Sequence, residues 1–216
     1  MDEVDANQMP NPQKPSSTES GARDAAGVGR IVRAAQGGDR AALDKLADLF
    51  WEDIYRMAYF RTGSAMDADD AAQDVFLKAF GKLDKLRDPE RFRPWLYSIA
   101  VNLVRDFHRK RVVMRIFKPL ERPGEGDRTA EAASEAPSAL EAALRKEFWQ
   151  KVGDFTAGLP RREREVFTLR FMDQLGIREI AEALGCGQSA VKTHLYRAVG
   201  KFKNKPDLLR VIRGSQ

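Results

Sequence analysis

The sequence predicts an all-α protein with two small helical domains joined by a flexible acidic linker. Through most of the chain, apolar residues recur at spacings of three and four, as they do on the buried face of a helix. No segment alternates apolar and polar residues over a useful length, which argues against strands. Residues 119–137 are rich in Pro, Gly, Ala and Glu, lack an apolar stripe and predict the linker.

These patterns divide the 216 residues into four parts. Residues 1–27 are rich in Pro, Ser, Asn, Gln and acidic residues with little to bury, so we expect a disordered tail. Residues 28–113 form the first domain, residues 114–141 the linker, and residues 142–216 the second domain.

The first domain is expected to hold four helical segments. Two of them cover residues 43–50 and 54–60, where apolar residues recur at helical spacing. The third begins at Asp67, whose carboxylate can accept hydrogen bonds from the free N–H groups of a first turn. The fourth begins near Phe92.

In the second domain the helical pattern resumes at residues 140–148, and Leu159-Pro160 begins another helix, because proline is tolerated in a first turn. Residues 176–202 then predict two short helices joined by a tight turn. The first of these ends at Gly185, where a residue free to adopt the left-handed conformation is favoured. The two buried stripes are Ile177, Ile180, Ala181 and Leu184, then Val191, Leu195, Ala198 and Phe202.

The second short helix carries a polar and basic face opposite its buried stripe. That face consists of Ser189, Lys192, Thr193, Tyr196 and Arg197. Two helices that meet at a glycine-containing turn, with such a face on the second, are typical of a helix-turn-helix that reads DNA. An ordinary helical hairpin with a solvated face is the alternative on these residues alone.

The distribution of charge is more informative than its total, since the net charge of +5 and the pI of about 9.4 are modest. Residues 105–118 and 188–213 are strongly basic, each with a single acidic residue, whereas residues 119–141 are acidic. Two basic patches separated by an acidic spacer indicate two modules that face phosphate groups.

The content of cysteine and histidine excludes several kinds of site. Cys186 is the one cysteine, so the chain can form no internal disulfide, and with only His108 and His194 it cannot supply a four-ligand zinc site. We expect neither a metal nor another cofactor, and we expect Cys186 to act as a small buried residue in its turn. No apolar run reaches the ~20 residues of a membrane span, and no signal peptide is apparent, so we expect a cytoplasmic protein without membrane insertion.

An exposed leucine marks the third helix of the first domain. The side opposite its apolar stripe carries Asp70, Gln73, Asp74 and Leu77. A purely solvated face has no use for a leucine among acidic residues, so this face predicts a protein-binding surface. A single exposed leucine without function is the common alternative.

The fourth helix combines a core stripe with a polar row. The core stripe is Leu96, Ile99, Ala100, Leu103 and Phe107, and the polar row is Ser98, Asn102, Arg105 and Arg109. Asparagine can read base edges and arginine can grip phosphates bidentately. The flanking Trp95 and Tyr97 could stack on unpaired bases. Core packing of Trp95 and a solvated arginine face are the alternatives.

Taken in order, four stretches resemble the extracytoplasmic-function (ECF) type of RNA polymerase sigma factor, the smallest members of the sigma-70 family. They are DADDAAQDVFLKAF at 67–80, FRPWLYSIAVNLVRDFHRKR at 92–111, LPRREREVFTLRF at 159–171, and IREIAEALGCGQSAVKTHLYRA at 177–198. The resemblance covers roughly residues 30–113 and 142–203.

The resemblance implies that the first domain docks on the clamp helices of the polymerase β′ subunit through Asp70, Gln73, Asp74 and Leu77. The same domain would open and read the promoter −10 element through Trp95, Ser98, Asn102, Arg105 and Arg109. A flipped base would lie beside the loop at residues 87–91, with Asn102 as the pocket asparagine. Such factors are not enzymes.

For the second domain, the resemblance implies that the reading helix enters the major groove of the −35 element while the domain rests on the β-subunit flap. The reading residues would be Gln188, Ser189, Lys192, Thr193, Tyr196 and Arg197. An anti-sigma protein that covers the polymerase-binding faces of both domains is also implied. The family often has Ser or Thr where Gly187 stands and commonly Arg at His194, which bears on the −35 sequence preferred.

Two other classes fit less well. A one-component regulator of the LuxR-like type has a similar helix-turn-helix, but it needs a ligand or phospho-acceptor domain that the helical first half does not supply. An enzyme on a helical scaffold needs a constellation of paired acids, metal ligands or a nucleophile, and no such constellation is present in the sequence.

Overall fold

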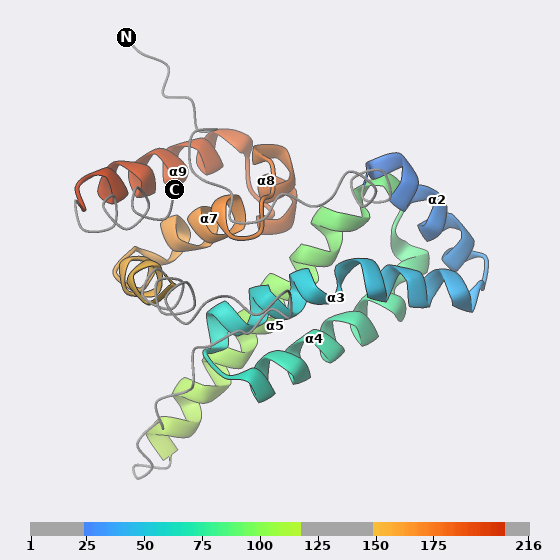
Figure 1. Cartoon of the computed structure of the whole chain (residues 1–216), viewed down its shortest axis with the longest axis horizontal. Coiled ribbons are helices and arrows are strands. Elements are labelled where there is room, and N and C mark those ends of the chain that lie inside the picture. The colour runs from blue at the N-terminus through green and yellow to red at the C-terminus, as the bar shows by residue number, and fades with distance from the viewer. Residues whose placement is uncertain (1–23, 118–148, 206–216) are drawn as a thin grey trace, which may run out of the picture.

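The chain folds into two groups of α-helices, which the computed structural model describes for residues 24–117 and 149–205, with backbone alone for 108–117. The first group contains α2 (Ala25–Gln36), α3 (Arg40–Thr62), α4 (Ala65–Phe80) and α5 (Phe92–Phe117), with 3₁₀ turns η1 (Leu83–Lys85) and η2 (Pro89–Arg91). The second contains helical residues 149–157, α7 (Arg161–Phe171), α8 (Ile177–Leu184) and α9 (Gln188–Lys203). Within the described ranges there is no strand, so the all-α prediction is confirmed (Figure 1).

Helix α3 is a single helix of 23 residues, where the sequence pattern predicted two segments. Its buried positions keep helical spacing from Leu46 through Phe50 and Ile54 to Ala58, so nothing interrupts it between the two predicted pieces. The Asp39 carboxylate caps it by accepting hydrogen bonds from two backbone N–H groups. The additional helix α2 precedes it, and its stripe of small residues, Val28, Val32 and Ala35, is buried.

Helix α4 begins earlier than predicted. Ser64, not Asp67, is the N-cap, and its hydroxyl accepts a hydrogen bond from the Asp67 N–H at 3.3 Å. Serine is as good a cap as aspartate, and the earlier start adds Ala65 and Met66 to the helix. Asp67 lies in the first turn, where a negative charge is favoured by the helix dipole.

Aromatic and aliphatic side chains pack α3, α4 and α5 together. The Phe50 and Phe92 rings join α3 to α5, and the Trp51 and Phe76 rings stack between α3 and α4, with centroids 5.4 and 5.7 Å apart. Helix α2 lies against η2, where a Cβ on Gly29 would come within 2.9 Å of Glu90 Cγ. This close approach fixes the loop that leads into α5.

The second group packs around three phenylalanines. Phe155, Phe167 and Phe202 lie with ring centroids 5.2–5.8 Å apart and join residues 149–157 to α7 and α9. Helix α7 begins at Arg161, directly after Pro160. Helix α8 ends at Gly185 with φ +62°, as the predicted helix-turn-helix requires.

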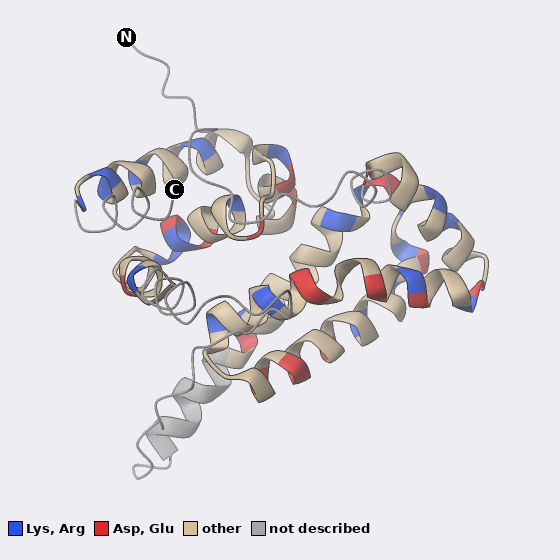
Figure 2. Ribbon diagram, in the orientation of Figure 1, with Lys and Arg blue, Asp and Glu red and all other residues tan. Residues whose placement is uncertain are grey.

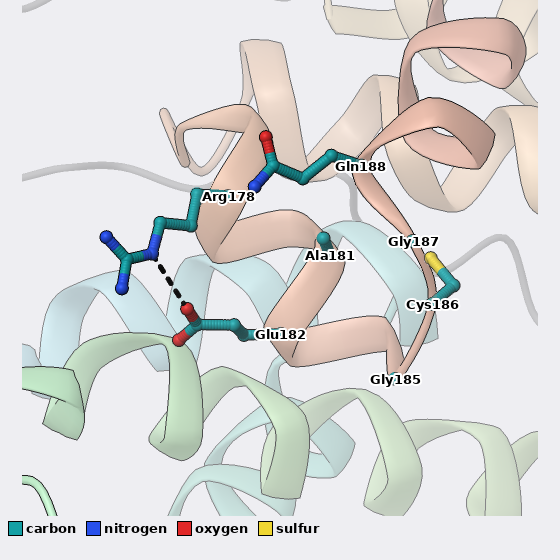
Figure 3. A pocket seen from close by; sticks show the side chains of 7 residues that line it. All are labelled: Arg178, Ala181, Glu182, Gly185, Cys186, Gly187 and Gln188. Atoms are coloured by element: carbon teal, nitrogen blue, oxygen red, sulfur yellow. Dashed lines mark hydrogen bonds and ion pairs between the residues drawn. The ribbon is translucent and has the colours of Figure 1, made fainter.

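The two groups contact each other directly. Helix α8 packs on α5, and buried residues of both helices belong to one apolar cluster (Figures 1 and 3). The predicted domains therefore share an interface in addition to their separate cores. Most of the predicted tail (1–27) and linker (114–141) lies outside the described residues.

The left-handed backbone conformation at Gly185 predicts that a substitution there lowers the stability of the fold. Any other L-residue is strained there, so Gly185→Ala should lower the free energy of unfolding by about 1–2 kcal/mol. Gly200→Ala is the control, because Gly200 lies inside α9 without a positive φ and has open space around its Cα. Urea denaturation of both variants compares them, and equal stabilities would contradict this role for Gly185.

Candidate polymerase and DNA interfaces

The outer face of α4 is exposed as the sequence predicted. Its inner stripe, which includes Ala72, Val75 and Phe76, is buried against neighbouring helices. The four candidate residues Asp70, Gln73, Asp74 and Leu77 are all exposed, Leu77 by 72%. The acidic residues of α4 lie in its first ten residues, and Lys78 follows in its last turn (Figure 2). The arrangement presents an apolar side chain within an acidic surface, which suits a partner with a basic rim and an apolar centre.

Met66 extends this face and was not among the sequence candidates. It is 73% exposed and lies four residues before Asp70, so its spacing to Asp70, Gln73 and Leu77 is four, three and four. Residues at such spacing share one side of a helix. The same spacing was visible in the sequence, but the later start predicted for the helix left Met66 outside it.

The side chains of the polar row on α5 are only partly exposed, and some of them form hydrogen bonds within the protein. Asn102 is exposed, and its Oδ1 accepts a hydrogen bond from Arg105 Nη1 at 3.3 Å. Ser98 is half-buried and its hydroxyl donates to the Trp95 carbonyl at 2.6 Å. Arg109 lies further along α5, and its side chain is outside the described residues.

Arg105 forms a bidentate ion pair with Glu165 of α7. Arg105 Nε and Nη2 donate to the two carboxylate oxygens of Glu165, each at 2.8 Å. Arg161 also donates to Glu165 at 3.1 Å. Burial alone would raise the pKa of Glu165, but the hydrogen bonds and charges of Arg105 and Arg161 outweigh it and lower that pKa. The Arg105 guanidinium, which was predicted to bind a phosphate, therefore binds the Glu165 carboxylate in this structure.

The two flanking aromatic residues behave differently. Trp95 is half-buried, with its ring centroid 5.9 Å from that of Phe92. Tyr97 is fully buried, so the prediction that it could stack on bases is wrong. Its ring lies under the Arg93 guanidinium at 5.7 Å, and burial raises the pKa of its hydroxyl well above the usual value.

The burial of Tyr97 belongs to a second stripe on α5. Tyr97, Val101 and Val104 are buried at spacings of four and three, whereas the predicted core residues Ile99 and Phe107 are only half-buried. The buried arc of α5 is wider than one stripe because α8 covers this helix in addition to its own group.

The reading face of α9 is fully open. Gln188, Ser189, Lys192, Thr193, Tyr196 and Arg197 are all exposed, Tyr196 by 82%. The opposite stripe of Val191, Leu195, Ala198 and Phe202 is buried, as predicted. A helix anchored on one side with a polar, basic and aromatic face on the other has the geometry needed to enter a major groove.

A hollow of about 510 Å³ lies at the turn between α8 and α9. Arg178, Glu182, Cys186 and Gln188 contribute side chains to it, and Arg178 Nε donates to Glu182 Oε1 at 3.2 Å (Figure 3). Cys186 is half-buried against the core here, so the expected full burial is not reached.

Within the described ranges, no three His, Cys, Asp or Glu residues gather in a way that could hold a metal ion. None of the helices in those ranges has the length and apolar character that crossing a bilayer requires.

Comparison with known families shows to which family the chain belongs. The family model described as Sigma-70 region 2 matches residues 50–112, and the model described as Sigma-70, region 4 matches residues 150–202. The chain belongs to the sigma-70 family. The two matches fall on the two helical groups, here named domain 2 (described residues 24–117) and domain 4 (149–205), in the order that the sequence resemblance implied.

Individual relatives place this sigma factor in the ECF type. It is 29% identical over 172 residues to the ECF RNA polymerase sigma factor SigW of Bacillus subtilis, covering 79% of this chain and 91% of that protein. It is 31% identical over 178 residues to the RNA polymerase sigma-H factor of Pseudomonas aeruginosa, covering 78% and 88%. Sigma factors bind core RNA polymerase and direct promoter-specific initiation, and the region 2 match disfavours the LuxR-like alternative.

A solved structure has the same architecture. The structure of CnrH in complex with the cytosolic domain of CnrY matches with a TM-score of 0.62 and 25% identity over 83% of this chain and 97% of that one.

The lowered pKa of Glu165 predicts a dependence of stability on pH. A carboxyl group whose pKa is depressed in the folded state contributes stability that is present above its ordinary pKa of about 4.5 and is lost as the pH falls through the lowered value. At pH 7, Glu165→Gln should lower the free energy of unfolding by on the order of 1 kcal/mol, since the pair is partly exposed. Denaturation from pH 7 to pH 3 should show this difference shrinking, and a constant difference would contradict the assignment.

Proposed function

We propose that this ECF sigma factor docks on core RNA polymerase through α4, reads the −10 element through α5 and reads the −35 element through α9. The observation that carries the proposal is the presence, in one chain, of an exposed acidic-apolar face on α4 and an exposed polar-basic face on α9. The first has the character of a protein-binding surface and the second that of a groove-reading helix. The protein acts in the cytoplasm and has no catalytic activity of its own.

For polymerase binding, the clamp helices of β′ contact Asp70, Gln73, Asp74 and Leu77. The high exposure of Leu77 supports this, because docking would bury a side chain that otherwise lies in water. Met66 at the other end of the face provides a second apolar anchor. Domain 4 rests on the flap of the β subunit.

For promoter reading, Asn102 contacts a flipped −10 base beside the loop at residues 87–91, while Arg105 and Arg109 contact phosphates. Asn102 is exposed, and Trp95, two turns earlier on α5, is half-buried, which supports a pocket with one polar and one aromatic wall. Ser98 lies at the half-buried end of the same row. On the −35 element, the six exposed residues of α9 contact base edges and phosphates.

For regulation, an anti-sigma protein holds the factor inactive. The support is the likeness to CnrH, whose structure was solved with the cytosolic domain of CnrY bound. A factor that exposes both Leu77 and Tyr196 leaves two apolar side chains for such a protein to cover.

Reconstituted transcription tests the function. Core polymerase with this chain should start transcripts at defined sites in a library of genomic promoters from the native host, and core alone should not. In the same assay with a randomised −10 region, Asn102→Ala should change the preference at one position, by about 1–3 kcal/mol for the favoured base. Absence of any defined start across the library would contradict the function.

The core-binding face has a matched pair of variants. Leu77→Asp should weaken binding to the β′ clamp helices at least tenfold, because it puts a desolvated charge in the centre of the contact. Lys85→Gln is the control, since it makes the same change in net charge and Lys85 is exposed on η1, outside this face. Titration of each variant with a clamp-helix fragment compares them, and unchanged affinity of Leu77→Asp with intact helicity would remove the assignment.

A further inference from the structure

The α4–α5 loop, residues 81–91, has little regular structure of its own. It contains the two short turns η1 and η2, of three residues each. The last carbonyl groups of a helix have no partner inside it, and in such short turns these are most of the carbonyls. Leu83 and Leu86 are buried, whereas Arg87 and Asp88 are exposed. The exposed part of the loop therefore depends on contacts from outside for a fixed position.

Gln36, the last residue of α2, holds the first turn of this loop. Its side-chain Nε2 donates to the backbone carbonyls of Leu83 and Leu86, each at 2.9 Å. The two N–H groups of one amide thus bridge the first residue of η1 and the residue that follows η1. Because a hydrogen bond restricts direction in addition to distance, this bridge sets the position from which the chain continues toward η2.

An earlier turn of α2 holds η2. Gly29 is buried, and a Cβ there would lie 2.9 Å from Glu90 Cγ and 3.4 Å from the Glu90 backbone nitrogen. Val28 and Val32 of the same helix are buried in one core cluster with Leu86. Helix α2 therefore contacts the loop at both of its turns, through a hydrogen-bonded bridge at η1 and a close backbone approach at η2.

Helix α2 lies outside the part of the chain that the family comparison covers. The Sigma-70 region 2 model matches residues 50–112, which include the α4–α5 loop and most of α5 but not α2. Figure 1 shows α2, in blue, beside the segment that leads into α5. The contacts of Gln36 and Gly29 therefore add a support that the matched region does not contain.

A pocket for a flipped base depends on the exact position of its walls. The base is selected by hydrogen bonds to its edge and by the fit of the pocket around it. A displacement of about 1 Å is enough to weaken such contacts severely. A loop that is held at both of its turns keeps its part of the pocket in place before DNA arrives.

We propose that α2 positions the α4–α5 loop for base selection at the −10 element, with Gln36 and Gly29 as positioning residues that do not touch DNA. This inference rests on the proposed function, since it assigns residues 87–91 and Asn102 to the flipped base. Gln36 fixes η1, and the missing side chain of Gly29 lets η2 lie directly on α2. Together they set the position of the loop side of the base pocket.

Gln36→Met tests the bridge, because methionine has a similar length and helix propensity but no side-chain N–H group. The full-length variant is assayed with core polymerase on a promoter library with a randomised −10 region. Discrimination at the flipped position should fall roughly threefold to tenfold, as the loss of one or two hydrogen bonds predicts. Preference at the −35 element should be unchanged, since α9 is not altered.

Ala34→Met is the matched control. It places the same side chain on an exposed position of the same helix, and residues two apart do not share a helix face. The control should keep the discrimination of the parent, and an equal loss in both variants would overturn the proposal. A uniform loss of transcription by Gln36→Met with unchanged base preference would show a purely structural role and would overturn it too.

A double-mutant cycle tests the contact at η2. Gly29→Ala should also reduce discrimination, because the new Cβ would displace Glu90. Glu90→Ala removes the Cγ that this Cβ would meet, so Gly29→Ala/Glu90→Ala should recover most of the discrimination of Glu90→Ala alone. Additive losses in the cycle would contradict positioning through this contact.

Hydrogen exchange of the free chain provides a readout that does not depend on DNA. The backbone N–H groups of residues 82–91 should exchange roughly threefold faster or more in Gln36→Met than in the parent, with those of α3 unchanged. Equal exchange in both proteins would overturn the bridge. If Asn102→Ala alters the −10 preference and Gln36→Met does not, only the positioning role is wrong; if the parent starts transcripts at no defined site, the proposed function itself fails.

Discussion

The packing of α5 on two sides is the constraint on which the rest of the structure depends. One side carries Leu96 and Ala100 into the core of domain 2, and the other carries Tyr97, Val101 and Val104. Helix α8 lies on α5, so one helix fixes both the fold of domain 2 and the position of domain 4. The polar row lies on the part of α5 that remains, where Asn102 is exposed and Arg105 is paired with Glu165 of domain 4.

The exposed faces follow from the same arrangement. Helix α4 packs on α3 and α5 through alanine, valine and phenylalanine, which leaves Met66 and Leu77 on the outside. Helix α9 is held by Phe155 and Phe167 through Phe202, which turns Tyr196 away from the core. In both helices a strongly buried stripe forces the opposite face into solvent, where it is available to a partner.

Local pattern was sufficient to predict much of this. The two stripes of the helix-turn-helix and the turn at Gly185 follow from helical periodicity and the backbone freedom of glycine, and both are present. The exposure of Leu77 could likewise be predicted from helical periodicity. The sequence did not predict the start of α4 at Ala65, because Ser64 and Asp67 are equally good helix caps. It did not predict that α3 is one continuous helix, because the half-buried positions of α3 weaken its apolar pattern.

What the sequence could not predict is the contact between the domains. The burial of Tyr97 and the pairing of Arg105 with Glu165 join residues that are distant in the chain, and each side chain alone suits a solvated face equally well. Charge complementarity is a property of two surfaces that face each other, so it can be recognised only once the structure shows which surfaces are in contact.

The account as a whole is tested most directly by the distance between the two domains in the free factor and in its promoter complex. Spin labels on Asp84→Cys and Asp154→Cys, with Cys186→Ser removing the native thiol, would report this distance by double electron–electron resonance. Both positions are exposed, one on each domain. The account predicts a single short distance in the free chain and an increase of several tens of ångströms in complex with core polymerase and promoter. Elements centred near −35 and −10 are roughly 25 base pairs apart, or about 85 Å along B-DNA, so domains that read both must separate. The same short distance in both states would contradict it.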